Sequence, residues 1–236
     1  MNIQQFAANI DKQILGTGNQ AVLLDVVKKY SQPEALSELL ESAWEQNSDH
    51  IIADSYLHPN GFDKLVLVSG ETFKLRLHNF HPPKVMKPAE SVHNHKWEFA
   101  SSILFGGYKA QEFDTTGGEQ KREHYRYSKE EGLEYVGTTT VGVTDEYEVS
   151  KGHSYFMPGD VYHSITRISD QGCITLMMTG YTKETTTNVY SLNELDLEKG
   201  RIHCGLKMYE GQEIADTLQA VKTKLNLTTK QPHTHV

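Results

Sequence analysis

Three histidines are spaced so that they could bind one metal ion. His93 and His95 are separated by a single residue. Side chains two positions apart on an extended strand leave the same face, so two imidazoles at this spacing can hold one ion with little rearrangement. A third imidazole, His163, opens an apolar segment directly after a Pro-Gly-Asp turn at residues 158–160. The pattern predicts a mononuclear metal site with imidazole nitrogen as the ligand.

Short segments rich in Val, Ile, Thr, Tyr and Phe surround these histidines, separated by Gly, Pro, Asn and Asp. Such segments predict many short strands in a sandwich or barrel. Residues 62–69 and 71–80 have the pattern of a hairpin, and residues 161–168 and 173–179 predict another. The polar residues 114–132 are expected to form an excursion between strands.

Helical periodicity is confined to the ends of the chain. We predict an N-terminal helical segment packed outside the barrel and a last helix at residues 213–225. The predicted organisation of the chain is a helical segment at 1–50, a barrel at 51–182, a C-terminal extension of the same domain at 183–225 and a disordered tail at 226–236.

Composition excludes several classes of protein. The 236 residues carry a net charge of −8 without a basic block, so nucleic acid is not an expected partner. No apolar run reaches the ~20 residues that a membrane span needs. The opening residues lack the basic start and apolar centre of a signal peptide. Two cysteines, Cys173 and Cys204, support no disulfide framework. We therefore expect a cytoplasmic protein with no membrane partner.

The first histidine stretch resembles the first motif of the cupin superfamily, in which His-x-His is often followed by a glutamate and then a glycine. Here His93-Asn94-His95 is followed by Glu98 and Gly106. Glu98 comes three positions after His95, so on an unbroken strand it would point away from the histidine face. Glu98 is a further candidate ligand, and a site of three histidines is the preferred interpretation.

The second stretch resembles the second cupin motif, which is a glycine, five residues, Pro-x-Gly, two residues and a histidine. Gly152, Pro158 and His163 fall at these spacings, and Asp160 stands where the motif has its second glycine. We expect Gly159 to supply the positive φ of the turn. The resemblance implies an all-β cupin-type double-stranded β-helix, or jelly-roll barrel, with His93, His95 and His163 as metal ligands.

Among cupins, the chain is most similar to the three-histidine thiol dioxygenases, such as cysteine dioxygenase. Residues 56–62 stand where that family has its substrate-binding segment, and His58 is the basic residue nearest to the position of the family's arginine. The family's Ser-His-Tyr relay would fall near Thr175, Met177 and Thr179, and none of its three residues is retained. The resemblance therefore implies the metal and leaves the substrate open.

These observations predict a mononuclear non-haem Fe(II)-dependent oxygenase or dioxygenase. A trio of ligands on one side of the ion leaves positions where substrate and O₂ can meet. Neutral imidazoles leave the charge of the ion uncompensated. This favours a small anionic substrate, either a thiol or an amino-acid-like molecule. Arg76 and Tyr155 are the candidate catalytic or substrate-binding residues, and Arg167 is a further one. Ni, Mn or Zn would also suit imidazole ligands.

Two other functions fit the same residues. One is a cupin isomerase or lyase that uses the metal as a Lewis acid, and the other is a non-catalytic cupin that binds a small ligand. The resemblance also implies a homodimer. Asp160, Glu98 and Glu112 are candidate hydrogen-bond partners of the ligands. Histidines to which the sequence assigns no role are His58, His124, His153 and His203.

Overall fold

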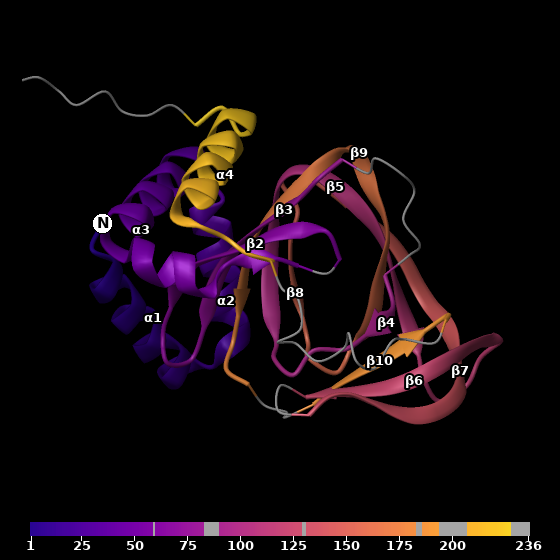
Figure 1. The fold of residues 1–236 in the computed structure, drawn as a ribbon. Helices are drawn as coiled ribbons and strands as arrows, with labels where there is room; N and C mark the ends of the chain where they lie inside the picture. The colour runs from indigo at the N-terminus through magenta and orange to yellow at the C-terminus, as the bar shows by residue number, and fades with distance from the viewer. Residues whose placement is uncertain (59, 83–89, 129–130, 183–185, 194–206, 228–236) are drawn as a thin grey trace, which may run out of the picture.

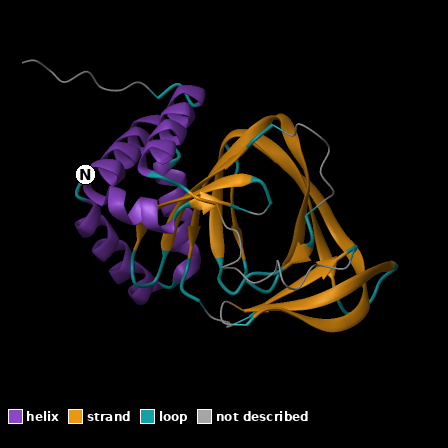
Figure 2. Cartoon of the chain, viewed as in Figure 1, coloured by secondary structure: helices purple, strands orange, loops and turns teal. Residues whose placement is uncertain are grey.

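The computed structural model describes the chain except residues 59, 83–89, 129–130, 183–185, 194–206 and 228–236. Four helices gather on one side of a β barrel (Figures 1 and 2). They are α1 (Ile3–Thr17), α2 (Asn19–Tyr30), α3 (Pro33–Asp54) and α4 (Gly211–Lys224). The strands are β1 (Tyr56–Leu57), β2 (Phe62–Ser69), β3 (Lys74–Phe80), β4 (Val92–His93), β5 (Phe99–Asp114), β6 (Gln120–Ser128), β7 (Gly132–Ser150), β8 (Ser154–Met157), β9 (Tyr162–Thr179), β10 (Thr187–Ser191) and β11 (Lys207–Met208).

One antiparallel sheet closes on itself because its long strands β5 and β9 pair along most of their length. The sheet runs in the order β11-β1-β2-β3-β9-β4-β10-β6-β7-β5-β8, and the β9–β5 pairing joins its two halves into a ring. The predicted fold class, an all-β barrel with accessory helices packed outside, is confirmed. None of the described helices is both long enough and apolar enough to span a membrane.

The sheet formed by β2, β3, β9 and β5 has two different faces, because successive side chains of a strand point to opposite sides. One face packs against the helices in the main hydrophobic core. Each large apolar side chain buried there stabilises the fold by ~1.5–3 kcal/mol. The other face lines the barrel interior. The core members from these strands include Leu65, Leu67, Leu75, Leu77, Ala100, Leu104, Ile174 and Leu176.

The prediction of a hairpin at residues 161–179 is wrong, because both of its arms belong to the single strand β9. Gly172 on β9 has φ 84°, and Gly106 on the facing strand β5 has φ 64°. A Cβ atom on Gly106 would collide with the carbonyl oxygen of Gly172. The two glycines therefore let β5 and β9 bend together at a point where the turn-rich sequence suggested a chain reversal.

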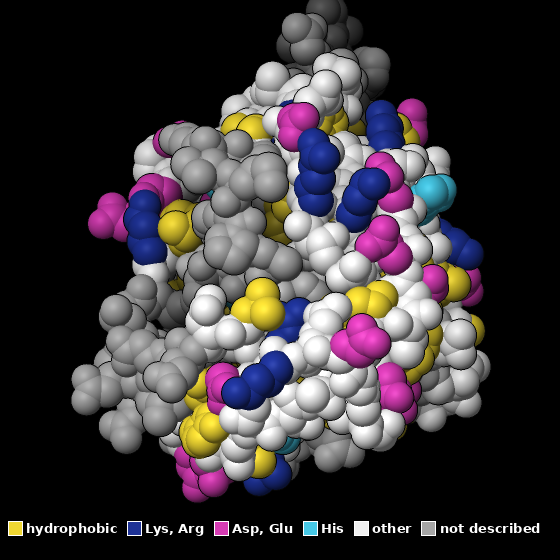
Figure 3. Space-filling view, turned by 90° about the vertical axis from the view of Figure 1, so that its right-hand side faces the viewer, with side chains coloured by type: hydrophobic (Ala, Val, Ile, Leu, Met, Phe, Trp, Pro, Cys, Tyr) yellow, Lys and Arg dark blue, Asp and Glu magenta, His cyan; other side chains and the backbone are white. Residues whose placement is uncertain are grey.

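The predicted excursion at residues 114–132 contains the strand β6. This strand lies between β7 and β10 and pairs with both. The sequence of β6 shows no alternation of apolar and polar residues, because most of its side chains are polar or charged and Tyr125 is its only buried residue. On the face of the barrel away from the helices, acidic and basic side chains are interspersed, and neither sign gathers into one patch (Figure 3).

Candidate metal centre

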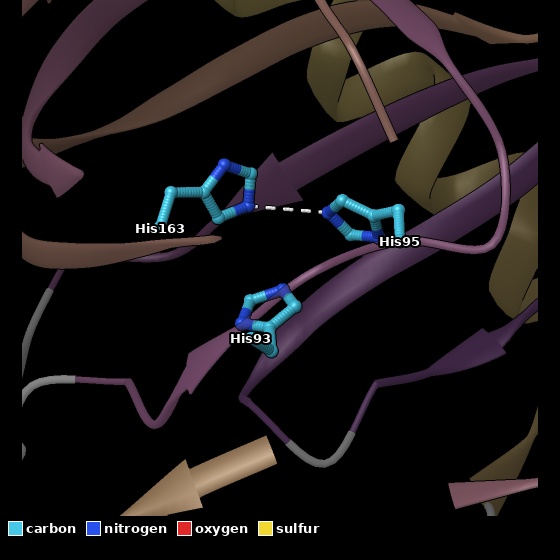
Figure 4. Close-up of side chains that lie close together, drawn as sticks. All are labelled: His93, His95 and His163. Carbon is cyan, nitrogen blue, oxygen red and sulfur yellow. Dashed lines mark hydrogen bonds between the residues drawn. The ribbon is translucent and has the colours of Figure 1, made fainter. Parts of the chain in front are cut away.

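His93, His95 and His163 point toward one another inside the barrel (Figure 4). Each offers one ring nitrogen, and the three nitrogens lie within 4.8 Å of one another. The Nε2 atoms of His95 and His163 are 3.1 Å apart. An ion bound at about 2.0–2.1 Å from each imidazole nitrogen would separate two ligands by roughly 3 Å. The residues therefore fit a single metal ion held by three imidazoles.

Backbone pairing places these side chains. His93 ends β4 and lies directly opposite His163 on β9. Because β4 stops at His93, His95 stands in the connection to β5 rather than on the extended strand that we expected. The backbone N–H of His95 donates to the carbonyl oxygen of Gly159 at 3.0 Å. The turn that precedes His163 thus also holds His95 in place.

Gly159 is needed for a different reason from the one predicted. It is not among the described glycines with positive φ. A Cβ atom at this position would lie 2.9 Å from the carbonyl oxygen of His95 and 3.0 Å from that of Trp97. The contact below 3.0 Å is with a backbone atom, so a methyl group here would require the backbone to shift. Glycine therefore permits the close approach of the two segments that carry the ligands.

Burial keeps the imidazoles of His95 and His163 in the neutral form that binds metals. Desolvation, followed by the neighbouring His93 and His163, lowers the pKa of His95 well below its usual value. Desolvation and His93 lower the pKa of His163 to about 3. The Nδ1 atom of His93 donates to the carbonyl oxygen of Ser91 at 2.9 Å, which leaves the Nε2 lone pair for an ion.

Glu98 lies outside this cluster. Its Oε2 atom accepts a hydrogen bond from the Nδ2 atom of Asn19 on α2, at 3.0 Å. Trp97 and Phe99 instead pack on His95, with ring centroids 5.8 and 5.1 Å from that of the imidazole. Trp97 and Phe99 thus share a side with His95 although the strand is broken there, and the group that could hold a metal consists of the three histidines without Glu98.

A cavity of about 100 Å³ adjoins the three histidines. Tyr155, a predicted site residue, lines it, and its hydroxyl group hydrogen-bonds to that of Tyr108. Burial raises the pKa of Tyr155 to about 12, so its phenol stays protonated at neutral pH. The cavity is lined by Phe62, His78, Phe80, Glu90, His93, His95, Phe99, Ser101, Tyr108, Ala110, Tyr147, Tyr155, His163, Ile165, Thr175 and Met177.

Arg76 and Arg167, the two predicted arginines, have different surroundings. Arg76 lies on β3 and is 7% exposed, with its guanidinium carbon 5.1 Å from the ring centroid of Trp97. Burial lowers the pKa of Arg76 to about 10, so the side chain still carries its charge at pH 7. Arg167 is exposed and forms an ion pair with Asp170 at 3.4 Å. Arg76 is therefore the buried one of the two, and it is not among the residues that line the cavity.

The remaining predicted residues lie around the barrel. The ring of His58 stacks on Phe62, with centroids 4.4 Å apart, and that of His124 stacks on Tyr190 at 4.5 Å. His153 accepts a hydrogen bond from the backbone of Ser150. Glu112 lies opposite His163 across the β5–β9 pairing, but its carboxylate hydrogen-bonds to Tyr147. Asp160 is in the turn before His163, and His203 lies outside the described residues.

Sequence reasoning missed Glu90 and Tyr108 and placed His78 only on the strand face of Arg76, whereas all three line the cavity. His78 alternates with Arg76 on β3, and this alternation is a signal in the sequence. For Glu90 and Tyr108 the sequence holds no such signal, because they reach the cavity only through the pairing of β9 with its neighbours.

No protein-family model matches this chain, and no curated protein matches it. Solved structures of cupins are similar to it. An RmlC-like cupin from Shewanella frigidimarina is 17% identical, with a TM-score of 0.33, over 56% of this chain and 86% of that one. A cupin domain from Bordetella pertussis is 15% identical, with a TM-score of 0.28, over 52% of this chain and 95% of that one.

A hydroquinone 1,2-dioxygenase in complex with Cd²⁺ and 4-hydroxybenzonitrile is 10% identical to this chain. Its TM-score is 0.35, and the match covers 60% of this chain and 75% of that one. These structural likenesses are too distant to indicate an activity. The fold assignment therefore rests on the strand pairing of this chain, and the site assignment rests on the geometry of its three histidines.

Proposed function

We propose that this protein is a mononuclear non-haem Fe(II)-dependent oxygenase of the cupin type, acting on a small anionic substrate. The observation that carries the proposal is the convergence of His93, His95 and His163 beside a cavity of about 100 Å³. When bound, Fe(II) would supply the redox chemistry that allows O₂ to react with the substrate. In a dioxygenation the substrate supplies the electrons and takes up both oxygen atoms, so no further reductant is needed.

The charge of the ligands supports an anionic substrate. His95 and His163 are held neutral by burial, so they would not offset the charge of a divalent ion. The carboxylate of Glu98 is turned toward Asn19 and does not offset it either. A thiolate or carboxylate of the substrate would complete the charge balance by direct binding. This argument does not distinguish a thiol from an amino-acid-like substrate.

Among the titratable side chains of the cavity lining, three are poorly suited to act as the base of an isomerase or lyase. Removal of a proton from carbon works best with a base whose pKa lies near the operating pH. Burial raises the pKa of Tyr155 to about 12 and also raises that of Tyr108, so both phenols stay protonated. Burial lowers the pKa of His78 well below its usual value, which makes it a weak base. Glu90 accepts hydrogen bonds from the side chain of Asn60 and the backbone of Ile165.

Metal content tests the proposal. The protein is purified without added metal and without a histidine tag, alongside His163→Ala and the matched control His153→Asn, which removes an imidazole outside the site. We expect near-stoichiometric iron in the wild type and in His153→Asn, and its loss in His163→Ala. Zinc, nickel or manganese with the same loss would favour the isomerase or lyase. A wild type without metal would favour the ligand-binding cupin.

Partners and location complete the proposal. We infer that O₂ and a small molecule are the partners, and that neither nucleic acid nor a membrane is bound. We also infer a cytoplasmic homodimer. Two strands, β11 and β8, end the sheet, and an unpaired strand edge can pair with a second copy. Light scattering of the purified protein tests the dimer, and a mass of one chain would contradict it.

A further inference from the structure

Asn94 stands between two of the candidate ligands, and its side chain is buried. It is 8% exposed and is not among the residues that line the cavity. A side-chain amide that is removed from water is costly unless hydrogen bonds satisfy it. The Oδ1 atom of Asn94 accepts a hydrogen bond from the backbone N–H of Asn188 on β10, at 2.7 Å. The neighbouring strand therefore holds this side chain.

The register of β4 and β10 shows what this hydrogen bond replaces. The two strands are antiparallel, and Val189 lies opposite His93, so the next residues to face each other are Asn94 and Asn188. In a regular antiparallel ladder, such a pair exchanges two backbone hydrogen bonds. Here the backbone N–H of Asn94 donates to the carbonyl oxygen of Asn188, at 3.3 Å. The return bond goes to the side chain of Asn94 and not to its backbone carbonyl oxygen.

This replacement lets the chain leave the strand at Asn94. The last residue of β4 is His93. Because the side chain of Asn94 supplies the acceptor, its backbone carbonyl group need not take part in the ladder, and the N–H of Asn188 still has a partner. The next backbone N–H, that of His95, donates to the carbonyl oxygen of Gly159 at 3.0 Å. Asn94 thus connects the β10 ladder to the turn that holds His95.

The placement of His95 depends on this change of direction. His93 is fixed by its position opposite His163 on β9. His95 lies outside the strands, yet its ring centroid is 4.9 Å from that of His93 and 5.0 Å from that of His163 (Figure 4). The path of the backbone through Asn94 therefore decides whether the second imidazole reaches the other two.

We propose that Asn94 is a positioning residue of the metal centre. Its side chain replaces one backbone bond of the β4–β10 ladder, and this replacement sets the direction in which His95 leaves the strand. The inference rests on the proposed function, because it concerns the ligands of the proposed metal. Leucine has nearly the shape of asparagine but offers no acceptor, so Asn94→Leu would leave the backbone N–H of Asn188 without its partner.

Metal affinity measures the consequence for the site. Metal-free wild type, Asn94→Leu and Asn94→Asp are titrated with Co(II) under anaerobic conditions, and the visible absorption of the bound ion reports both affinity and ligand arrangement. We expect Asn94→Leu to bind about tenfold to a hundredfold more weakly, as for other groups that orient metal ligands, and with an altered spectrum. Asn94→Asp keeps an oxygen acceptor, so it should recover the wild-type spectrum and most of the affinity.

Two controls separate positioning from a general loss of stability. Asn193→Leu makes the same substitution at an exposed position beyond the end of β10, and it should leave affinity and spectrum unchanged. Leu218→Ala removes a core side chain of α4, which lowers stability on the helical side of the sheet. It should unfold at a lower urea concentration and still bind Co(II) as the wild type does. Binding as weak in Leu218→Ala as in Asn94→Leu would overturn the inference.

Metal-free protein tests the hydrogen bond without the ion. NMR measures hydrogen exchange of the Asn188 amide and the ring resonances of His95. In Asn94→Leu the amide should exchange about tenfold faster and the ring resonances should shift, whereas Asn94→Asp should match the wild type. Unchanged exchange and unchanged ring resonances in Asn94→Leu would overturn the inference, whatever the metal content. If both change as expected but the wild type binds neither Co(II) nor iron, the proposed function fails and the role of Asn94 in placing His95 stands.

Discussion

The Nε2 atom of His95 lies 3.1 Å from the Nε2 atom of His163, although one residue stands in a connection and the other on β9. Burial keeps both rings neutral. Two nitrogen lone pairs would repel each other at this distance unless a proton or a cation lies between them. A metal ion removes that repulsion and uses both lone pairs, and the Nε2 atom of His93 completes the set.

Removing any one ligand should therefore release the metal. We expect His95→Ala and His93→Ala to lower the metal affinity at least about a hundredfold, because two imidazoles hold an ion far less well than three. Titration of the metal-free variants with Fe(II) under anaerobic conditions, followed by calorimetry, measures the change. His124→Ala, which lies outside the cluster, is the control. Unchanged affinity in His95→Ala would contradict the assignment.

Gly159 should be as important as a ligand, because its lack of a side chain allows the turn to contact His95 and Trp97. Gly159→Ala should destabilise the fold by ~1–3 kcal/mol through overpacking and should weaken metal binding. Urea unfolding and metal content measure the two effects. Gly16→Ala is the control, since a Cβ atom there meets nothing within 4 Å. Equal stability of the two variants would show that the turn has room to move.

Local geometry explains why the sequence pointed to the three histidines that the structure brings together. The spacing of His93 and His95, and the turn before His163, depend only on neighbouring residues, so a pattern can identify them. The hairpin of β2 and β3 was predicted for the same reason, and the pairing of the two strands confirms it. Alternation along an extended strand also places Arg76 on the face of β3 opposite Leu75 and Leu77.

Long-range pairing explains what the sequence did not reveal. The bend at Gly106 and Gly172 depends on two strands that meet far apart in the chain, and each glycine alone is typical of a turn. His78 likewise lines the cavity beside Thr175 only once β3 pairs with β9. The pairing of β5 with β9, which closes the barrel, decides which residues meet, and no short stretch of the sequence indicates this pairing.

Glu98 gives a direct test of the three-histidine set. Glu98→Gln keeps an oxygen atom that can accept from Asn19, but it removes the negative charge. Because the carboxylate faces α2, we expect the metal content and affinity to change by less than about twofold. Inductively coupled plasma mass spectrometry of wild type, Glu98→Gln and His163→Ala gives the comparison. A loss of metal in Glu98→Gln as large as that in His163→Ala would make Glu98 a fourth ligand.

The pH dependence of stability follows from the buried histidines. Burial lowers the pKa of His58 and of His163 to about 3 in the folded protein. In the unfolded chain each ring takes up a proton below about pH 6.5, so the unfolded state binds more protons and stability falls as pH falls. We expect the metal-free protein to lose about 1–2 kcal/mol per ring between pH 7.5 and pH 5.

Urea unfolding of the metal-free protein at pH 7.5 and at pH 5 measures this loss. His58→Phe keeps an aromatic ring to stack on Phe62 but cannot titrate. Between pH 7.5 and pH 5 the free energy of unfolding of His58→Phe should therefore fall by about 1–2 kcal/mol less than that of the wild type. At pH 7.5 the two proteins should have similar stability. The same fall in stability for wild type and His58→Phe would mean that His58 is protonated in the folded state and that its ring is not held neutral by burial.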